Sequence, residues 1–440
     1  MMKTLSTYLS PQELAKNFSA FHAVDLVKLL DQYATEELLL FCQQLSLEQL
    51  AIIIEQSDLA LQLRIVQQLS TEKLLKVFTY MSKDDIADML GELPIALRKS
   101  LLKKMKENDR VILTELLGYP IDSAGGLMTT EYIALNENLC VQQALSKIKE
   151  IAPQTEIITI IYLLNNQKQL VGTVNLRDLF THQEEKLLKD FKNPNVLKVY
   201  PEEDQEQVSL LVSKYDLLAI PVVNHRDLLL GIITVDDIID VIIDEQTEDL
   251  LGLAGVDKEE RLKAPLIDSV KKRLPWLIIN LATAFLASFT IGLFEGTIEK
   301  VVALASVMSI VAGMGGNAGT QTLSLMVRSI ALGEVSFKED WRLIMKEFSL
   351  GFINGAITGL ITAIIIYWHY HNVFLGLIIL LAMIGNLVIA GVFGFTIPLL
   401  LKKMHIDPAL ASSIFLTTMT DVGGFFIFLG LAQLFLNYLV

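Results

Sequence analysis

The last 32 residues constrain the fold most strongly, because they form one apolar run with a single formal charge. Residues 409–440 read ALASSIFLTTMTDVGGFFIFLGLAQLFLNYLV, and Asp421 is the only charged side chain among them. A helix of this length can cross a bilayer. A carboxylate near the bilayer midplane costs roughly 3 kcal/mol on insertion scales unless water, a cation or a partner compensates it. Asp421 is therefore either a helix-capping or helix-packing residue or part of a cation site on a permeation path.

Composition separates the chain into two parts. The chain is 52% hydrophobic with a mean hydropathy of +0.47, too apolar for a purely soluble protein. Residues 275–440 hold seven Lys or Arg and eight Asp or Glu, so nearly all of the net charge of −14 precedes them. This acidic balance argues against a nucleic-acid partner and against docking on anionic lipid, and it favours cations.

The cysteines and the N-terminus indicate a cytosolic first half. Cys42 and Cys140 are far apart and have no second ligand at metal-like spacing, which is typical of buried thiols in a reducing compartment. The sequence MMKTLSTYLSPQELAKNF lacks the apolar core and cleavage site of a signal peptide. We expect the first 270 or so residues to stay in the cytosol.

Residues 1–126 predict an all-α domain. Apolar residues recur at spacings of three and four from about residue 9 to residue 117, and Ser46, Ser70 and Ser82 each precede an acidic first turn that suits a helix start. We expect a small superhelix of short helices. Asp84 and Asp88 lie four residues apart on one helix face. This spacing is typical either of a cation site or of an ordinary solvated helix start.

Residues 127–245 contain an internal repeat with an α/β pattern. The segment from Gly172 to Asp178 matches the segment from Gly231 to Asp237, 59 residues later, and each follows an apolar strand and a polar turn. This order of strand, turn and strand, followed by a helix that starts with Thr or Asn and then Asp, resembles a CBS repeat. Two such repeats in tandem form one CBS module. The resemblance implies adenine-nucleotide binding by four residues at the helix starts, Asn175, Asp178, Thr234 and Asp237. Helix capping is the alternative role for the same residues.

An acidic stripe continues from the second repeat. Positions 237, 240, 244 and 248 step by three or four, so like charges share one helix face, which is unfavourable until a cation binds. A solvated face is the alternative. Acidic side chains recur from 236 to 249 with no Lys between them, which favours divalent-cation sensing. Residues 246–273 then form an amphipathic connector toward the membrane part.

Residues 274–440 predict five membrane-spanning helices, at about 274–294, 303–327, 349–369, 374–400 and 409–438. Lys and Arg concentrate before the first span, between the second and third, and between the fourth and fifth, whereas the opposite loops hold only Lys300. The positive-inside rule then places the N-terminus in the cytosol and the C-terminus outside.

Polar residues gather in the second and fifth spans. The second reads Ala312-Gly-Met-Gly-Gly-Asn-Ala-Gly-Thr-Gln-Thr322, so we expect its glycines to interrupt the helix and expose carbonyls to a cavity. A small-residue packing seam is the alternative, but it does not require the polar side chains. Asn280, Asn354 and Asn386 occur singly and are expected to bond helices together. The candidate ion-site residues are Gly316, Asn317, Thr320, Thr417 and Asp421.

These segments together resemble the MgtE family of magnesium channels. The resemblance rests on Gly-Met-Gly-Gly-Asn-Ala-Gly-Thr-Gln-Thr, on Asp407-Pro-Ala-Leu-Ala and on Thr-Thr-Met-Thr-Asp421-Val-Gly-Gly-Phe. It implies a homodimer with one pore at the two-fold axis, Asp421 as the pore aspartate, and a plug helix over 248–264. It also implies regulatory Mg2+ at Asp84, Asp88, Asp237, Asp240, Glu245, Glu248 and Asp249. Ser309 stands where family members often carry Pro, which affects the expected kink of the second span.

We therefore expect a multi-pass protein of the cell (inner) membrane that conducts Mg2+ inward and is gated by cytosolic Mg2+. ATP in the CBS module is the further ligand that the CBS resemblance implies, and helix capping by the same residues stays open. The alternatives are a CBS-regulated secondary transporter of another divalent cation or solute that uses Asp421 as a proton or sodium relay, and a membrane-anchored nucleotide sensor. An enzyme is not expected, because no nucleophile–base pair or His-rich metal motif occurs.

Overall fold

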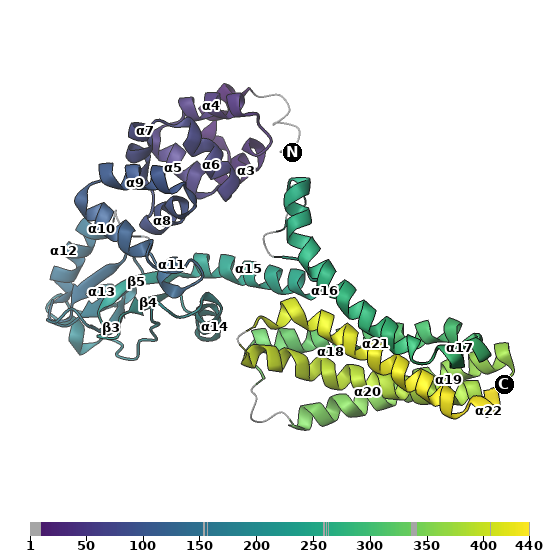
Figure 1. Cartoon of the computed structure of the whole chain (residues 1–440). Coiled ribbons are helices and arrows are strands. Elements are labelled where there is room, and N and C mark those ends of the chain that lie inside the picture. The colour runs from purple at the N-terminus through teal and green to yellow at the C-terminus, as the bar shows by residue number, and fades with distance from the viewer. Residues whose placement is uncertain are drawn as a thin grey trace. The chain divides into compact units, whose positions relative to one another are not determined.

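The computed structural model describes residues 10–152, 155, 157–257, 260, 262, 264–335, 341–404 and 406–439. The chain forms two compact units, Met1–Val241 and Ile242–Val440, and each is described on its own (Figure 1).

The first part of unit 1 is a series of short helices, as predicted. Ser46, Ser70 and Ser82 are the N-caps of three of them, and the Ser46 and Ser70 hydroxyls accept backbone N–H groups of the first turn. The helices are α2 (Pro11–Lys16), α3 (Ala23–Leu30), α4 (Thr35–Gln44), α5 (Leu47–Glu55), α6 (Leu59–Gln68), α7 (Thr71–Val77), α8 (Lys83–Glu92), α9 (Ile95–Lys104) and α10 (Glu107–Leu116), with 3-10 turns η1 (Phe18–Ala20) and η2 (Phe78–Tyr80).

The second part of unit 1 contains the predicted repeat. Strand β2 (Ile160–Leu164) pairs antiparallel with β3 (Leu170–Asn175), and β4 (Ala219–Val223) pairs antiparallel with β5 (Leu229–Thr234), so corresponding strands start 59 residues apart. Each hairpin has a register shift at the same place, after Leu163 and after Val222. The remaining elements are α11 (Ala124–Leu127), β1 (Ile133–Asn136), which is parallel to β2, α12 (Val141–Ile151), α13 (Leu176–Thr181), η4 (Leu188–Asp190) and α14 (Gln205–Tyr215).

Helix α15 (Val235–Leu253) follows β5 directly and carries the acidic stripe on one continuous helix. It ends before Gly255, whose φ of +70° lies in the left-handed region that glycine adopts without steric cost. Among the described residues of the predicted 248–264 plug helix, only 248–253 are therefore helical. Residues 258, 259, 261 and 263 of that segment lie outside the described residues.

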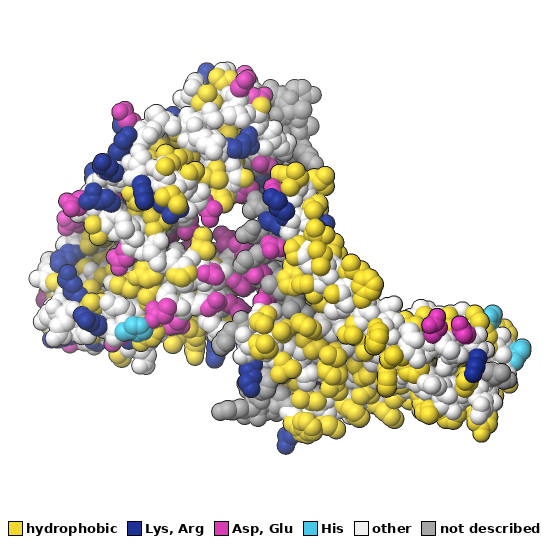
Figure 2. Space-filling view, viewed as in Figure 1, with side chains coloured by type: hydrophobic (Ala, Val, Ile, Leu, Met, Phe, Trp, Pro, Cys, Tyr) yellow, Lys and Arg dark blue, Asp and Glu magenta, His cyan; other side chains and the backbone are white. Residues whose placement is uncertain are grey.

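Unit 2 is a bundle of long helices. Four of the described helices are long and apolar enough to cross a membrane, and they lie within α16 (Leu266–Gly292), α19 (Trp341–Tyr370), α20 (Val373–Lys403) and α21 (Pro408–Leu434). The face of this unit that Figure 2 shows is covered largely by hydrophobic side chains. Two short helices, α17 (Glu295–Lys300) and α22 (Leu436–Leu439), lie at the ends of longer ones.

Helix α18 (Ala303–Ala331) is the fifth long helix, and it is not among these four because polar residues interrupt its apolar stretch. Its 29 residues span about 43 Å, enough to cross a bilayer. The predicted interruption by glycines is wrong, because the helix continues through Gly313, Gly315, Gly316 and Gly319 and through Ser309. Glycine keeps its backbone N–H and C=O, so packing against neighbouring helices can maintain the hydrogen-bond ladder.

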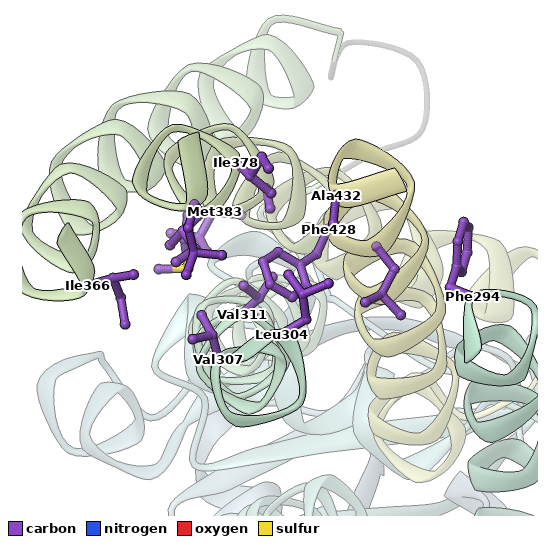
Figure 3. Close-up of a cluster of buried hydrophobic side chains, with 14 residues drawn as sticks. Phe294, Leu304, Val307, Val311, Ile366, Ile378, Met383, Phe428 and Ala432 are labelled. Atoms are coloured by element: carbon purple, nitrogen blue, oxygen red, sulfur yellow. The ribbon is translucent and has the colours of Figure 1, made fainter. Parts of the chain in front are cut away.

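The bundle is held together by an apolar core and by close helix packing. Leu304, Val307 and Val311 of α18 meet Ile378 and Met383 of α20 and Phe428 and Ala432 of α21 in this core (Figure 3). Helix α19 lies directly on α20 through three glycines four residues apart: a Cβ on Gly351 would come within 2.5 Å of the Leu387 carbonyl oxygen, and Gly355 and Gly359 are similarly enclosed.

Candidate functional site

Asn386 connects three helices at the centre of the bundle. Its side chain is fully buried, and Nδ2 donates a 2.8 Å hydrogen bond to the Val311 carbonyl oxygen of α18. A Cβ on Gly315 would overlap Asn386 Nδ2, and one on Gly424 of α21 would lie 2.7 Å from the same atom. The expectation that this asparagine bonds helices together is confirmed. Asn386 occupies the space beside positions 315 and 424, so both positions suit a residue without a side chain.

These contacts place Asn317 and Asp421 at one level of the bundle. Gly315 and Gly424 meet at Asn386, whereas a Cβ on Gly319 would lie 2.9 Å from a Leu416 methyl carbon. Residue numbers therefore rise along α18 as they fall along α21, so the two helices run antiparallel. Asn317 and Asp421 both lie between these two levels of contact. Asn317 is also the middle residue of α18, and Asp421 is the middle residue of α21. Both residues thus lie near the midplane of a bilayer that these helices cross.

The polar side chains at this level are accessible. Asn317, Thr320 and Thr417 are exposed, and Gly316 and Asp421 are partly exposed. Thr320 Oγ1 donates to the Gly316 carbonyl oxygen and Thr417 Oγ1 to the Ser413 carbonyl oxygen, both at 2.9 Å, which leaves the hydroxyl lone pairs available. Carboxylate, amide, hydroxyl and carbonyl oxygens are the donors that Mg2+ prefers. We call these five residues the midplane site.

One chain supplies only part of a coordination sphere at the midplane site. Within the described residues, no three Asp, Glu, His or Cys side chains are placed to hold a metal ion together. Asp421 is the single carboxylate within α18 and α21 as the structure describes them. The geometry thus suits a cation that retains much of its water, or a site completed by a second copy of the chain.

The glycines of α18 allow a matched test of this packing. Gly315→Ala should lower the free energy of unfolding by about 1–3 kcal/mol, because its methyl group would overlap Asn386. Gly313→Ala is the control, since a Cβ there meets nothing within 4 Å. Thermal unfolding of the detergent-solubilised protein measures both. Equal midpoints for the two variants would contradict the role of Asn386.

A second group of candidate residues lies in unit 1, where acids from four segments come together. Glu55 of α5 accepts a 3.1 Å hydrogen bond from the Ser82 backbone N–H, and Asp85 of α8 accepts a 2.7 Å bond from the Ser82 hydroxyl. Thr234 donates to Asp237 at the start of α15. Asp84 Oδ1 is buried without a hydrogen-bond partner among the described residues. We call Glu55, Asp84, Asp85, Asp88, Glu131 and Asp237 the acidic cluster.

The acidic cluster holds more negative charge than its surroundings compensate. Burial and then the charges of Asp84, Asp85, Asp237 and Glu92 raise the pKa of Asp88 to about 7, although its side chain still contacts solvent. Burial and neighbouring acids likewise raise the pKa of Glu55 to about 7 and those of Asp84 and Asp237 to about 6. A bound cation would relieve this repulsion, and the unpaired Asp84 oxygen could accept it or one of its waters.

The raised pKa values predict a pH-dependent stability. The same carboxyls titrate near pH 4 when unfolded, whereas Asp88 and Glu55 titrate near pH 7 when folded. Between these values the folded chain holds more protons, so its stability should fall as pH rises from about 4 to about 7. Mg2+ should raise the unfolding midpoint of unit 1 at pH 8 and have little effect at pH 5. A Mg2+ response that is the same at both pH values would contradict this explanation.

The other acids of the predicted stripe are distributed differently. Asp240 is exposed one turn beyond Asp237. Asp249 belongs to unit 2, where burial and the charges of Asp407, Glu245 and Glu248 raise its pKa to about 6. Asp407, whose charge acts on Asp249, was not predicted as a site residue. It caps α21 by accepting a 2.8 Å bond from the Ala409 N–H, and its position before Pro408 was the available signal.

The residues predicted for nucleotide binding have unequal surroundings. Thr234 is buried and bonded to Asp237, which is itself part of the acidic cluster. Negative charge there disfavours a phosphate group. Asn175, its counterpart in the first repeat, is exposed and is the N-cap residue of α13, but its side chain makes no capping hydrogen bond. Asp178 lies half-buried in the first turn of that helix. The first-repeat pair is therefore the more accessible of the two.

Comparisons with known proteins agree across the chain. Residues 308–431 match the MgtE family, described as divalent cation transporters, residues 21–122 match the MgtE intracellular N domain, and residues 188–244 match the CBS domain. The magnesium transporter MgtE of Enterococcus faecalis is 39% identical over 74% of this chain and 72% of its own length, and that of Bacillus subtilis is 35% identical over 82% and 80%.

A solved structure supports the same assignment for unit 1. The crystal structure of the cytosolic domain of the Mg2+ channel MgtE in complex with ATP is 30% identical in sequence. It superposes with a TM-score of 0.51 over 55% of this chain and 98% of that one.

Proposed function

Because the chain belongs to the MgtE family of magnesium transporters, we propose that it is a homodimeric Mg2+ channel of the cell (inner) membrane. In this proposal a cytosolic N domain (1–126), a tandem CBS module (127–245) and a connector (246–273) regulate a pore domain (274–440). The N-terminus lies in the cytosol and the C-terminus outside. Mg2+ passes inward through the midplane site.

The observation that carries the proposal is the accessible Asp421 at the middle of a membrane helix. A carboxylate exposed to lipid there is costly, and the neighbouring amide and hydroxyl groups on α18 and α21 also require polar partners. A second copy placed over this face would cover it and bring two Asp421 side chains to one axis. Two carboxylates would bind a divalent ion through its waters and disfavour monovalent ions.

The driving force is the membrane potential. Moving two charges inward through 100 mV releases roughly 4.6 kcal/mol, so the proposed pathway requires no ATP hydrolysis. The chain carries no Gly-rich phosphate loop with Lys that would support hydrolysis.

Gating would use the acids of both units. Cytosolic Mg2+ at the acidic cluster, and at Asp240, Glu245, Glu248 and Asp249 of α15, would offset repulsion and favour a closed arrangement. Loss of Mg2+ would restore the repulsion among Asp84, Asp88 and Asp237 and favour opening. This is a population shift caused by differential ion binding to two states. ATP would bind the CBS module near Asn175 and Asp178, since a relative's cytosolic domain was solved with ATP.

Flux through liposomes tests the function. Purified protein should carry Mg2+ into vesicles down a concentration gradient and faster at a negative internal potential, without ATP and without a proton or sodium gradient. Mn2+, Co2+ and Ni2+ added as competitors would establish selectivity. Flux that requires a proton gradient would instead indicate a secondary transporter, and absence of any flux would indicate a membrane-anchored sensor.

A further inference from the structure

Unit 1 contains a cavity of about 370 Å³ within the helical domain, on α7, η2, α8, the end of α9 and α10. Its apolar lining comes from Leu75, Phe78, Ile86, Met105 and Leu113. Ile86 and Leu113 are almost fully buried. This volume is within the range of sites that bind small organic molecules.

The rim of the cavity is basic although the chain is acidic. Lys76, Lys83, Lys104 and Lys106 line it, against only Glu72 and Asp109. The net charge around the cavity is therefore positive in a chain whose net charge is −14. Figure 2 shows Lys and Arg side chains gathered over the part of the molecule that α9 and α10 form.

Three of these four lysines are available for a ligand. Lys83 Nζ lies 3.5 Å from Asp109 Oδ1 in an ion pair. Among the described residues, Lys76, Lys104 and Lys106 form no ion pair, and all three are exposed. Lys side chains can cover apolar surface with their stems while the ammonium groups remain at the rim. A ligand with an apolar group inside and an anionic group at the mouth would satisfy both parts of the cavity.

We propose that this cavity binds a small amphiphilic organic phosphate, with the apolar group against Phe78, Met105 and Leu113 and the phosphate at Lys76, Lys104 and Lys106. The site lies on the helical domain, contains none of the residues of the acidic cluster or the CBS module named above, and does not depend on the proposed transport function. Lysine acts here as a point charge for phosphate.

Binding can be measured with a short-chain probe. Hexyl phosphate is titrated into the full-length protein in nanodiscs without divalent ions, by isothermal calorimetry, with empty nanodiscs as the blank. Inorganic phosphate tests the anionic group alone, and hexanol tests the apolar group alone. We expect saturable binding of hexyl phosphate at least tenfold tighter than that of either fragment.

Two charge-matched variants locate the site. Lys104→Glu with Lys106→Glu should weaken hexyl phosphate at least tenfold. Lys99→Glu with Lys103→Glu changes the net charge equally on the same helical segment, outside the cavity lining, and should stay within twofold of wild type. Lys76→Ala on α7 is a milder second variant that should weaken binding severalfold while leaving the unfolding midpoint unchanged.

Several results would overturn the proposal. They are the absence of saturable binding, equal losses in both charge-matched variants, and binding to empty nanodiscs as strong as to loaded ones. Inorganic phosphate binding as tightly as hexyl phosphate would mean an adventitious anion only.

Discussion

Asp421→Asn should reduce Mg2+ flux at least a hundredfold while leaving the fold intact. The substitution keeps the shape of the side chain and removes the only formal charge at the middle of α21. In the proposed dimer both carboxylates are lost. A hundredfold change in flux corresponds to a free-energy change of only about 2.8 kcal/mol. This is less than the cost expected for two uncompensated charges at the midplane. Flux into liposomes measured with a Mg2+ indicator provides the readout.

Asn354→Ala is the matched control for this prediction. Asn354 is also a polar, exposed residue within a long apolar helix, but it lies on α19 and is not one of the residues of the midplane site. Its flux should remain within about twofold of wild type. Undiminished flux in Asp421→Asn would remove Asp421 from the pathway, whereas equal losses in both variants would indicate a general packing defect.

Neutralising the acidic cluster should make the proposed channel insensitive to cytosolic Mg2+. Asp84→Asn, Asp88→Asn and Asp237→Asn together remove three carboxyls whose pKa values burial and mutual repulsion raise to about 6 or 7. In the proposed mechanism, Mg2+ closes the pore by offsetting this repulsion. The Mg2+ concentration that halves the current in excised patches should rise at least tenfold.

The control for the cluster uses acids from the same domain. Glu36→Gln with Glu48→Gln removes two exposed carboxylates at helix starts, outside the acidic cluster. Their loss should leave the Mg2+ dependence of closure unchanged. Wild-type closure in the triple variant would place the sensor elsewhere, with Asp249 and its neighbours in unit 2 as the next residues to neutralise.

Local patterns predicted most of the fold. The serines at positions 46, 70 and 82 stand at the N-caps of three helices, and the hydroxyls of Ser46 and Ser70 accept a backbone N–H of the first turn. The 59-residue repeat predicted paired hairpins, and even the register irregularities recur at equivalent positions. Periodicity and hydropathy are properties of neighbouring residues, so one sequence reveals them.

Contacts between distant residues were harder to predict. Glu55 and Glu131 belong to the acidic cluster, but nothing near them in the sequence indicates that burial and the charges on α8 would raise their pKa values. The glycines of α18 gave an ambiguous signal. Gly315 and Gly319 pack against Asn386 and Leu416, as a packing seam would, whereas Gly316 lies on the accessible face. Only the partners on α20 and α21 distinguish these roles.

The central position of Asn317 and Asp421 in their helices has an electrical consequence. In the proposed pore, a divalent ion that reaches the midplane site from either side has crossed about half of the membrane thickness. Binding there then moves the equivalent of one elementary charge through the full potential. The apparent affinity of a blocking divalent ion should therefore change about tenfold for each 60 mV, with opposite sign for ions applied from the two sides. A position near one face would make the block almost independent of voltage from that side.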